Sequence, residues 1–156
     1  MTIDIDSQLS EVKRLLTPER LSEMSASDRD QVIELVKALE TSVRREKSQD
    51  EFLCFCESVW PAFIEGGHHR KMAEKFERVA SGECKRLMIN MPPRMGKSQL
   101  TSWLLPAWVM GKMPDKKIIM ASHTAELAVR FGRMVRNLIG SDEYKDIFPE
   151  TSLTAD

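Results

Sequence analysis

Cysteine is scarce in this chain, and its spacing does not suit a metal site or a disulfide framework. The three cysteines are Cys54, Cys56 and Cys84, an odd number without a C-x-x-C pair. Such a set is typical of reduced thiols in a cytosolic protein, because disulfide scaffolds and structural zinc sites use larger sets at characteristic spacings. We therefore expect a cytoplasmic protein in which Cys54 and Cys56, which lie in an apolar run, belong to the core.

Long hydrophobic runs are also missing. The longest apolar stretches are far shorter than the roughly 20 residues that a membrane-spanning helix needs. The N-terminal segment is acidic and polar, which is not the pattern of a signal peptide. We expect neither a signal peptide nor a membrane partner.

The sequence lacks an excess of charge of one sign. Lys and Arg number 23 and Asp and Glu number 24, so the chain lacks the overall basicity that is typical of nucleic-acid-binding proteins. The charge is unevenly distributed, because Met1–Ser42 carries nine acids and five bases, whereas His68–Lys97 carries three acids and eight bases. The basic segment suits an anionic ligand, although a solvated helix face explains such a run at least as well.

The first part of the chain reads as helices with short breaks. Ser27 is the expected N-cap of a longer helix, and a polar, charged break follows at Arg44–Gln49. We place a domain boundary at this break, with a helical N-terminal appendage at 1–46 and a second domain at 47–156. The appendage either binds a partner or packs on the second domain.

The pattern changes within residues 47–156. Ser48 and Glu51 form an S-x-x-E capping box, which predicts a helix through the run FLCFCESVW. Beyond a further helix at about His68–Ala80, short apolar runs alternate with helical patterns. The predicted order is a strand at Lys85–Asn90, a helix at Ser98–Met110 that Pro106 kinks or ends early, a strand at Lys117–Ala121 and a helix at Thr124–Ile139. This alternation predicts an α/β fold, in which helices cover a parallel sheet.

The segment 91–100, MPPRMGKSQL, matches most of the phosphate-binding loop pattern G-x-x-x-x-G-K-[ST]. Gly96, Lys97 and Ser98 match its last three positions, whereas Met91 stands where the pattern begins with Gly. That first Gly mainly eases a tight turn, and Pro92-Pro93 can restrict the approach to the turn instead. With a predicted strand before the loop and a predicted helix after it, the context is that of a P-loop NTPase-type parallel sheet, incomplete in this chain.

The residues of this loop have distinct predicted roles toward ATP and Mg²⁺. Gly96 permits close approach of the backbone, so that N–H groups can point at phosphate oxygens. Lys97 reaches the β- and γ-phosphates, and the Ser98 hydroxyl is the predicted Mg²⁺ ligand. Arg94 either stabilises charge on the transferring γ-phosphoryl group or is a surface cation or a salt-bridge partner of a neighbouring subunit. The predicted nucleotide-binding residues are Pro92, Pro93, Arg94, Met95, Gly96, Lys97, Ser98 and Gln99, and the catalytic roles fall to Arg94 and Lys97.

Together with its surroundings, this loop resembles the ATPase half of the large subunit of tailed-phage terminases. The resemblance covers roughly residues 49–156. It rests on the PPR-x-GKS loop, the Pro-Ala-Trp that follows it, a Gly-x-x-Pro-Asp turn and a Phe-Pro near the end. It implies an additional-strand P-loop ATPase that drives double-stranded DNA into a preformed viral capsid. It also implies a homo-oligomeric ring that docks on a portal and works with a small terminase subunit in the host cytoplasm, and an adenine pocket that uses residues within Trp60–Arg70.

One element of that family is missing from the sequence. A Walker B motif is an apolar strand that ends in acids, which contact Mg²⁺ and orient the attacking water. The segment KIIMASHT ends instead in Ser122, His123 and Thr124, and the sequence ends at Asp156. The resemblance therefore predicts the N-terminal piece of a larger motor protein, without the Walker B acids and the nuclease domain, in which nucleotide binding survives and hydrolysis is weak or absent.

Two alternatives to the motor interpretation stay open. In the first, the chain is a non-catalytic interaction module that binds motor subunits or the portal. In the second, it is an unrelated P-loop protein such as a small kinase. A kinase needs a lid and a substrate-binding acid after the loop, and we find neither.

Other polar residues give weaker signals. His68-His69 has no further ligands at metal-binding spacing, so a helix start near the loop is favoured over a metal site. His123 either faces a cleft at the strand ends or belongs to a turn that caps a helix. Arg130, Arg133 and Arg136 recur every three residues, which fits a DNA or subunit surface but is more typical of the wet side of a helix.

Overall fold

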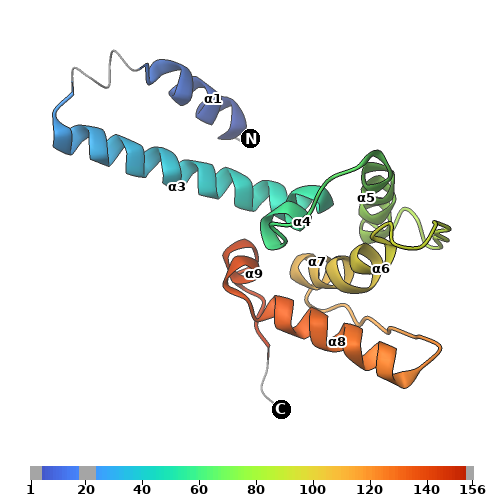
Figure 1. The fold of residues 1–156 in the computed structure, drawn as a ribbon. Coiled ribbons are helices and arrows are strands. Elements are labelled where there is room, and N and C mark those ends of the chain that lie inside the picture. Colours follow the sequence, from blue (N-terminus) through green and yellow to red (C-terminus); the bar gives the residue numbers. More distant parts are fainter. Residues whose placement is uncertain (1–4, 18–23, 154–156) are drawn as a thin grey trace. The chain divides into compact units, whose positions relative to one another are not determined.

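The computed structural model describes residues 5–17 and 24–153, and its elements within these ranges are helices (Figure 1). They are α1 (Ile5–Leu15), α3 (Ala26–Asp50), α4 (Phe52–Val59), α5 (Gly67–Ala80), α6 (Lys97–Gln99), the π-helical η1 (Leu100–Leu104), α7 (Leu105–Lys112), α8 (Ala125–Ile139) and α9 (Asp142–Ile147). The chain divides into two compact units, Met1–Glu46 and Lys47–Asp156.

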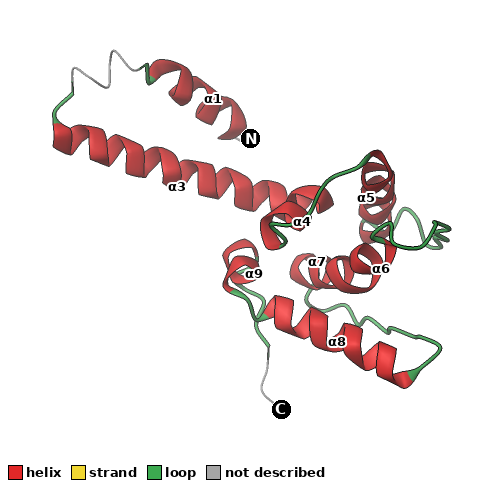
Figure 2. Ribbon diagram, in the orientation of Figure 1, coloured by secondary structure: helices red, strands yellow, loops and turns green. Residues whose placement is uncertain are grey.

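The predicted α/β fold is wrong. Lys85–Asn90 and Lys117–Ala121 are loop segments, and Figure 2 shows no strand in the described part of the chain. Some of their apolar side chains are exposed, with Met88 at 85% and Ile119 at 94%, whereas Ile89 and Met120 pack against the core. Parallel strands are stable when both faces are buried and neighbouring strands satisfy the backbone N–H and C=O groups. Because these two apolar runs lack such neighbours within the described residues, local sequence preference alone does not make them strands.

An aromatic core holds the helices of the 47–156 unit together. The ring of Phe52 meets those of Phe76 and Trp108 edge-on, with centroids 5.2 and 5.5 Å apart. Two buried aromatic residues, Trp108 and Tyr144, carry polar atoms, and both form hydrogen bonds. The Trp108 Nε1–H donates to the Ser48 carbonyl at 3.0 Å, and the Tyr144 hydroxyl donates to the Ala107 carbonyl at 2.8 Å. Burial raises the pKa of Tyr144, so this hydroxyl stays protonated as a donor.

One continuous helical run leads away from the candidate phosphate loop. It comprises α6, η1 and α7, so it begins one residue earlier than predicted and passes through Pro106 to Lys112. The prediction was that Pro106 kinks the helix or ends it early, and the early end is wrong. A proline removes one N–H donor and its ring crowds the carbonyl four residues earlier, and the wider π turn directly before Pro106 makes room for both effects.

The predicted break and capping box at the start of the second domain are also wrong. The helix α3 continues through Arg44–Gln49 to Asp50, because Arg, Glu, Lys and Gln are good helix formers as well as polar residues. Ser48 therefore lies inside a helix, where it is fully buried and its Oγ lies 2.9 Å from Ser58 Oγ. The N-cap of α4 is Glu51, without a side-chain hydrogen bond.

Side-chain caps do occur at other helix starts. The N-cap of α3 is Ser25 rather than the predicted Ser27, because the Asp28 N–H donates to Ser25 Oγ at 3.2 Å. Thr124 caps α8 by accepting from the Leu127 N–H, and the predicted helix at Thr124–Ile139 is confirmed within one residue.

Within the described residues of the Met1–Glu46 unit, an ion pair joins α1 and α3. Lys13 Nζ in α1 lies 2.7 Å from Glu40 Oε1 in α3, and both side chains are about half exposed. Such a surface pair stabilises a fold only slightly, because water screens the charges. A cavity of about 330 Å³ beside this pair is lined by Leu16, Val32 and Val36 among others, so the two helices do not fill the space between them.

The two cysteines of α4 are not reactive thiols. Cys56 is fully buried, as expected for a core residue, whereas Cys54 is half-buried. Burial and a hydrogen bond to Glu51 raise the pKa of Cys54 to about 12, and burial raises the pKa of Cys56 as well. Both therefore remain protonated near neutral pH, and neither is a candidate nucleophile.

Candidate functional site

Gly96 lies at the junction between the loop that begins at Met91 and the helical run that begins at Lys97. Figure 1 shows the start of this run at α6. It is the N-cap of α6 and has φ 75° and ψ 0°, in the left-handed region that side chains disfavour. A Cβ atom at this position would lie 3.2 Å from His69 Nε2 and 3.4 Å from Leu100 Cδ1. Glycine is thus required here both by backbone conformation and by the close approach of His69.

Arg94 is the one described non-glycine residue with a positive φ, at 64°. With Gly96 it places two left-handed residues on either side of Met95, whose φ is not positive. Where left- and right-handed residues alternate, successive backbone N–H groups can turn toward one side and form a concavity that binds anions. The unusual backbone of this loop therefore fits an anionic ligand.

We expect Arg94→Gly to be about 1 kcal/mol more stable than Arg94→Ala, because alanine keeps the left-handed strain and glycine removes it. Both variants lose the same cation, so their difference isolates the backbone contribution. The midpoints of urea unfolding measure it. Equal midpoints for the two variants would show that Arg94 is not held in the left-handed conformation in solution.

The polar groups of the loop are accessible to a ligand. Lys97 is half-buried, and the predicted nucleotide-binding residues on either side of it are exposed: Pro92, Pro93, Arg94, Met95, Ser98 and Gln99. No side chain caps α6. The first N–H groups of a helix lack intrahelical partners, and the helical run that continues to Lys112 adds its positive dipole end at this point. The start of α6 therefore presents backbone donors beside the Lys97 ammonium.

Met91, at the position where the usual pattern begins with Gly, is half-buried and packs against the hydrophobic core together with Ile89. Its side chain anchors the beginning of the loop to the helices. A glycine at this position would instead ease a turn. In this chain the turn is formed by Pro93 and Arg94.

A cavity of about 310 Å³ adjoins the loop and lies at the lower end of the size range of ligand pockets. On one side it is formed by the chain between α4 and α5 and by the first turn of α5, and on the other by the loop and the helix that follows. Its lining residues are Trp60, Phe63, Ile64, His68, His69, Arg94, Met95, Gly96, Gln99 and Leu100. The predicted adenine-pocket segment and the predicted phosphate loop are thus brought together around one cavity.

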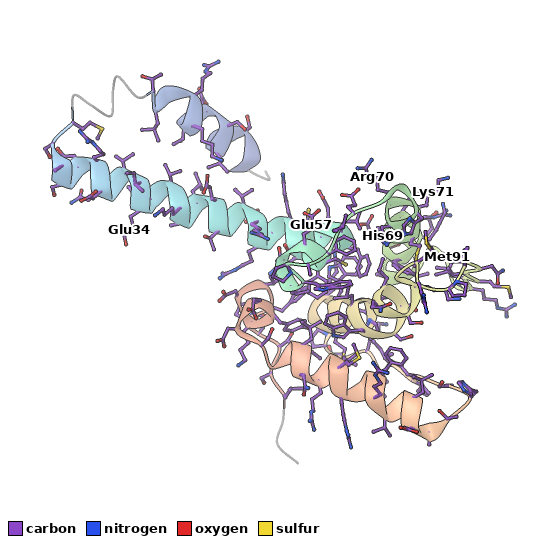
Figure 3. The ribbon with its side chains drawn as sticks, viewed as in Figure 1. Glu34, Glu57, His69, Arg70, Lys71 and Met91 are labelled. Carbon is purple, nitrogen blue, oxygen red and sulfur yellow. The ribbon has the colours of Figure 1, made fainter. Side chains whose placement is uncertain are left out.

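His69 forms the boundary between the cavity and the loop. It lies in the first turn of α5 with 9% of its surface exposed, whereas its neighbours Arg70 and Lys71 are exposed (Figure 3). Its Nδ1 accepts a hydrogen bond from the Gly66 N–H at 3.1 Å. Burial, and then the neighbouring His68, lower the pKa of His69, so the ring is neutral near neutral pH. The sequence placed a helix start here but gave no signal that His69 contacts the loop.

His68 faces the same cavity with a polar atom that has no partner. Its ring centroid lies 3.8 Å from that of His69, and its Nε2 is buried without a hydrogen bond among the described residues. The aromatic wall continues through Phe63, whose centroid is 5.1 Å from that of His69 and 5.7 Å from that of Trp60. Flat rings beside polar ring nitrogens suit a planar heterocyclic ligand.

His123 and the α8 arginines do not join this site. His123, Arg130 and Arg133 line a separate depression of about 780 Å³ along α8. The expectation that His123 faces a cleft at the ends of strands fails, because the sheet that would create this cleft does not form in the described residues. His123 instead lies in the turn before the Thr124 cap.

The described side chains do not form a metal centre by themselves. In residues 5–17 and 24–153, no three His, Cys, Asp or Glu side chains gather as metal ligands. The exposed Ser98 hydroxyl, in the first helical turn beside Lys97, fits a Mg²⁺ ion that takes its other oxygens from phosphate and water.

In residues 5–17 and 24–153, no helix combines the length and the apolar character needed to span a membrane.

Comparisons of this chain with protein-family models, with curated proteins and with solved structures find no match. The functional interpretation of the site therefore depends on its residues and their geometry.

Proposed function

We propose that residues 92–99 bind the phosphates of ATP together with Mg²⁺. The observation that carries this proposal is the left-handed Gly96 at an uncapped helix start, followed at once by Lys97 and Ser98. In this arrangement, backbone N–H groups and the Lys97 ammonium face the phosphates, and the Ser98 hydroxyl contributes to the Mg²⁺ site.

The charge of the loop supports an anionic ligand. Among the described residues, neither Arg94 nor Lys97 forms an ion pair, although Lys75, Arg78 and other cations nearby in sequence do so. Two cations without carboxylate partners, next to a helix N-terminus, repel each other until an anion neutralises them. A triphosphate with Mg²⁺ provides that charge and also takes up the loop N–H donors.

The cavity beside the loop supports a nucleotide rather than inorganic phosphate. Trp60, Phe63 and His68 provide flat faces, and Gln99 and His68 provide polar groups that can pair with a base edge. We assign the adenine to this cavity, within the Trp60–Arg70 segment that the terminase resemblance indicates.

The site favours binding over hydrolysis. None of the described residues that line the cavity carries a carboxylate, and a carboxylate is what orients the attacking water in related chemistry. Arg94 and Lys97 are proposed as transition-state cations in a complete site. In this proposal the chain is the ATP-binding segment of a cytoplasmic terminase-type motor that translocates double-stranded DNA, in a homo-oligomeric ring with a portal and a small subunit as partners.

A second candidate function is a non-catalytic interaction module. It is favoured by Met88 and Ile119, two large apolar side chains that are almost fully exposed on the loop segments before and after the helical run. An interaction module predicts that removing these side chains weakens capture of a partner, and that the chain shows no response to nucleotide.

The proposed function is tested by thermal unfolding with increasing Mg²⁺-ATP. A ligand that binds only the folded state stabilises it by about 2.7 kcal/mol at 100 times its Kd, so the melting temperature of the wild-type chain should rise by several degrees. Lys97→Ala should remove this rise without lowering the melting temperature of the free protein, because Lys97 is not part of the core.

Matched ligands and a matched variant separate the parts of the site. Lys116→Ala, at an exposed lysine in the turn after α7, should respond to Mg²⁺-ATP as the wild type does. Tripolyphosphate with Mg²⁺ should give part of the shift, and ATP should give more if the cavity holds the base. An unchanged melting temperature of the wild type with every ligand, or an equal rise in Lys97→Ala, would contradict the proposal.

A further inference from the structure

We propose that His69 is a positioning residue that holds the phosphate loop in its ligand-ready conformation by bridging the start of α5 to Gly96. This inference rests on the proposed function, since it concerns the same loop. The proposed role does not require a contact between His69 and the nucleotide, because the ring acts through the backbone of the loop.

The first side of the bridge is a pair of reciprocal hydrogen bonds at the start of α5. The Gly66 N–H donates to His69 Nδ1 at 3.1 Å, and the His69 N–H donates to the Gly66 carbonyl at 2.9 Å. Because Nδ1 is an acceptor, the neutral ring carries its proton on Nε2. The Nε2–H group is then directed away from Gly66.

The second side of the bridge is the loop. His69 Nε2 lies 3.2 Å from the point where a Cβ would stand on Gly96, so the ring occupies the space that the glycine leaves open. The backbones of Met95 and Ile64 oppose the effect of burial on the pKa of His69. The ring thus lies against Gly96, the residue that immediately precedes Lys97.

The consequence is a loop whose conformation is held before a ligand binds. A left-handed Arg94 and a left-handed Gly96 are costly to hold, and the surrounding structure must over-determine them. Among the described residues, His69 is the buried polar side chain next to this segment. A ligand then binds without the additional cost of ordering the loop.

The test uses the full chain and a readout that does not depend on nucleotide. Trypsin cleaves after Arg94, and the rate of cleavage at Arg94–Met95 reports local opening of the loop. We expect His69→Phe, which keeps an aromatic ring but removes both nitrogens, to accelerate this cleavage about three- to tenfold, as for the loss of one hydrogen bond. Cleavage after Lys117, an exposed residue of another loop, is the internal reference and should not change.

His69→Asn is the decisive variant. The asparagine Oδ1 lies where Nδ1 was and can accept from the Gly66 N–H, but asparagine is too short to fill the space beside Gly96. If His69 positions the loop, His69→Asn keeps a melting temperature close to that of the wild type and still shows faster cleavage at Arg94–Met95. His69→Gln, which reaches further, should slow this cleavage again. His123→Asn, at an exposed histidine outside the site, should match the wild type.

Nucleotide binding provides the second readout, measured with a fluorescent ATP analogue in Mg²⁺. We expect His69→Asn to raise Kd about three- to tenfold relative to wild type and His123→Asn. If the wild type binds no nucleotide but His69→Asn still accelerates cleavage, the proposed function fails and the positioning role stands. If His69→Asn matches the wild type in cleavage, the positioning role is overturned, whatever the nucleotide result.

Discussion

Replacing Trp108 with alanine should lower the free energy of unfolding of the 47–156 unit by about 3–5 kcal/mol, the range for removal of a large aromatic residue from a packed core. Trp108 is 1% exposed, and its ring meets that of Phe52 edge-on at 5.5 Å. The Lys112 ammonium lies 4.8 Å from the ring centroid, so the substitution also removes a cation–π contact. A loss of this size is a large fraction of the stability of a typical domain.

The hydrogen bond of Trp108 makes a separate contribution. Its Nε1–H donates to the carbonyl of Ser48, a fully buried residue, at 3.0 Å. Trp108→Phe keeps most of the ring but leaves that carbonyl without this donor, which should cost about 1–3 kcal/mol. The order of stability should therefore be wild type, then Trp108→Phe, then Trp108→Ala.

Urea unfolding followed by circular dichroism measures these differences, and Trp103 provides the matched control. Trp103 lies in the same helical run but is only partly buried, and its Nε1 has no partner among the described residues. Trp103→Ala should therefore destabilise less than Trp108→Ala. Equal losses at the two positions would mean that the Ser48 hydrogen bond and the Phe52 contact do not determine the stability of this core.

The helices could be predicted from the sequence where local signals agree. The helix α8 has a threonine cap and an apolar stripe, and its predicted range was correct within one residue. The strands could not be predicted reliably, since a short apolar run becomes a strand only when other strands cover and pair with it. Ile119 is 94% exposed, which shows that its apolar character alone did not determine its conformation. The helix α9 was missed because it is a single short helix near the end of the sequence.

Some features of the candidate site could likewise be predicted from the sequence, and others could not. The glycine at position 96 and the helix start are local features, and the P-loop pattern indicated both, although the helix begins at Lys97 and not at the predicted Ser98. The contact between His69 and Gly96 joins residues that are far apart in the sequence, so no local pattern reports it. The left-handed conformation of Arg94 is likewise a property of the folded loop, because arginine has no preference for that region.

The short motifs outside the loop, on which the terminase resemblance partly depends, have packing roles in this structure. Pro106, Ala107 and Trp108 are all buried, and the Ala107 carbonyl accepts from the Tyr144 hydroxyl. The glycine of the Gly-x-x-Pro-Asp turn is Gly111, which lies against Phe148 of the Phe-Pro pair. Two motifs that are separate in the sequence are therefore one contact in space, and their joint occurrence has a structural reason that is independent of nucleotide binding.

The contact between Gly111 and Phe148 predicts that a larger side chain at position 111 destabilises the fold. A Cβ atom on Gly111 would lie 2.4–2.6 Å from three ring atoms of Phe148, much closer than atoms can approach without movement. Phe148 is 6% exposed and packs beside Tyr144 at a centroid distance of 5.3 Å, so the ring has little room to move. We expect Gly111→Ala to lower the free energy of unfolding by about 2–3 kcal/mol, because overpacking outweighs the gain in helix propensity.

Gly132→Ala is the matched control, since Gly132 is also inside a helix but has no atom within 4 Å of an added Cβ. It should leave stability unchanged or raise it by up to about 1 kcal/mol. If the Phe148 ring is the cause of the loss, Gly111→Ala should cost less in a Phe148→Leu background than in the wild type, and the double-mutant cycle measures this coupling. Additive losses would place the cost of Gly111→Ala elsewhere in α7. Coupled losses would show that the Gly-x-x-Pro-Asp and Phe-Pro motifs specify one packing contact, which leaves the loop at Gly96 and Lys97 as the part of the predicted resemblance that concerns nucleotide chemistry.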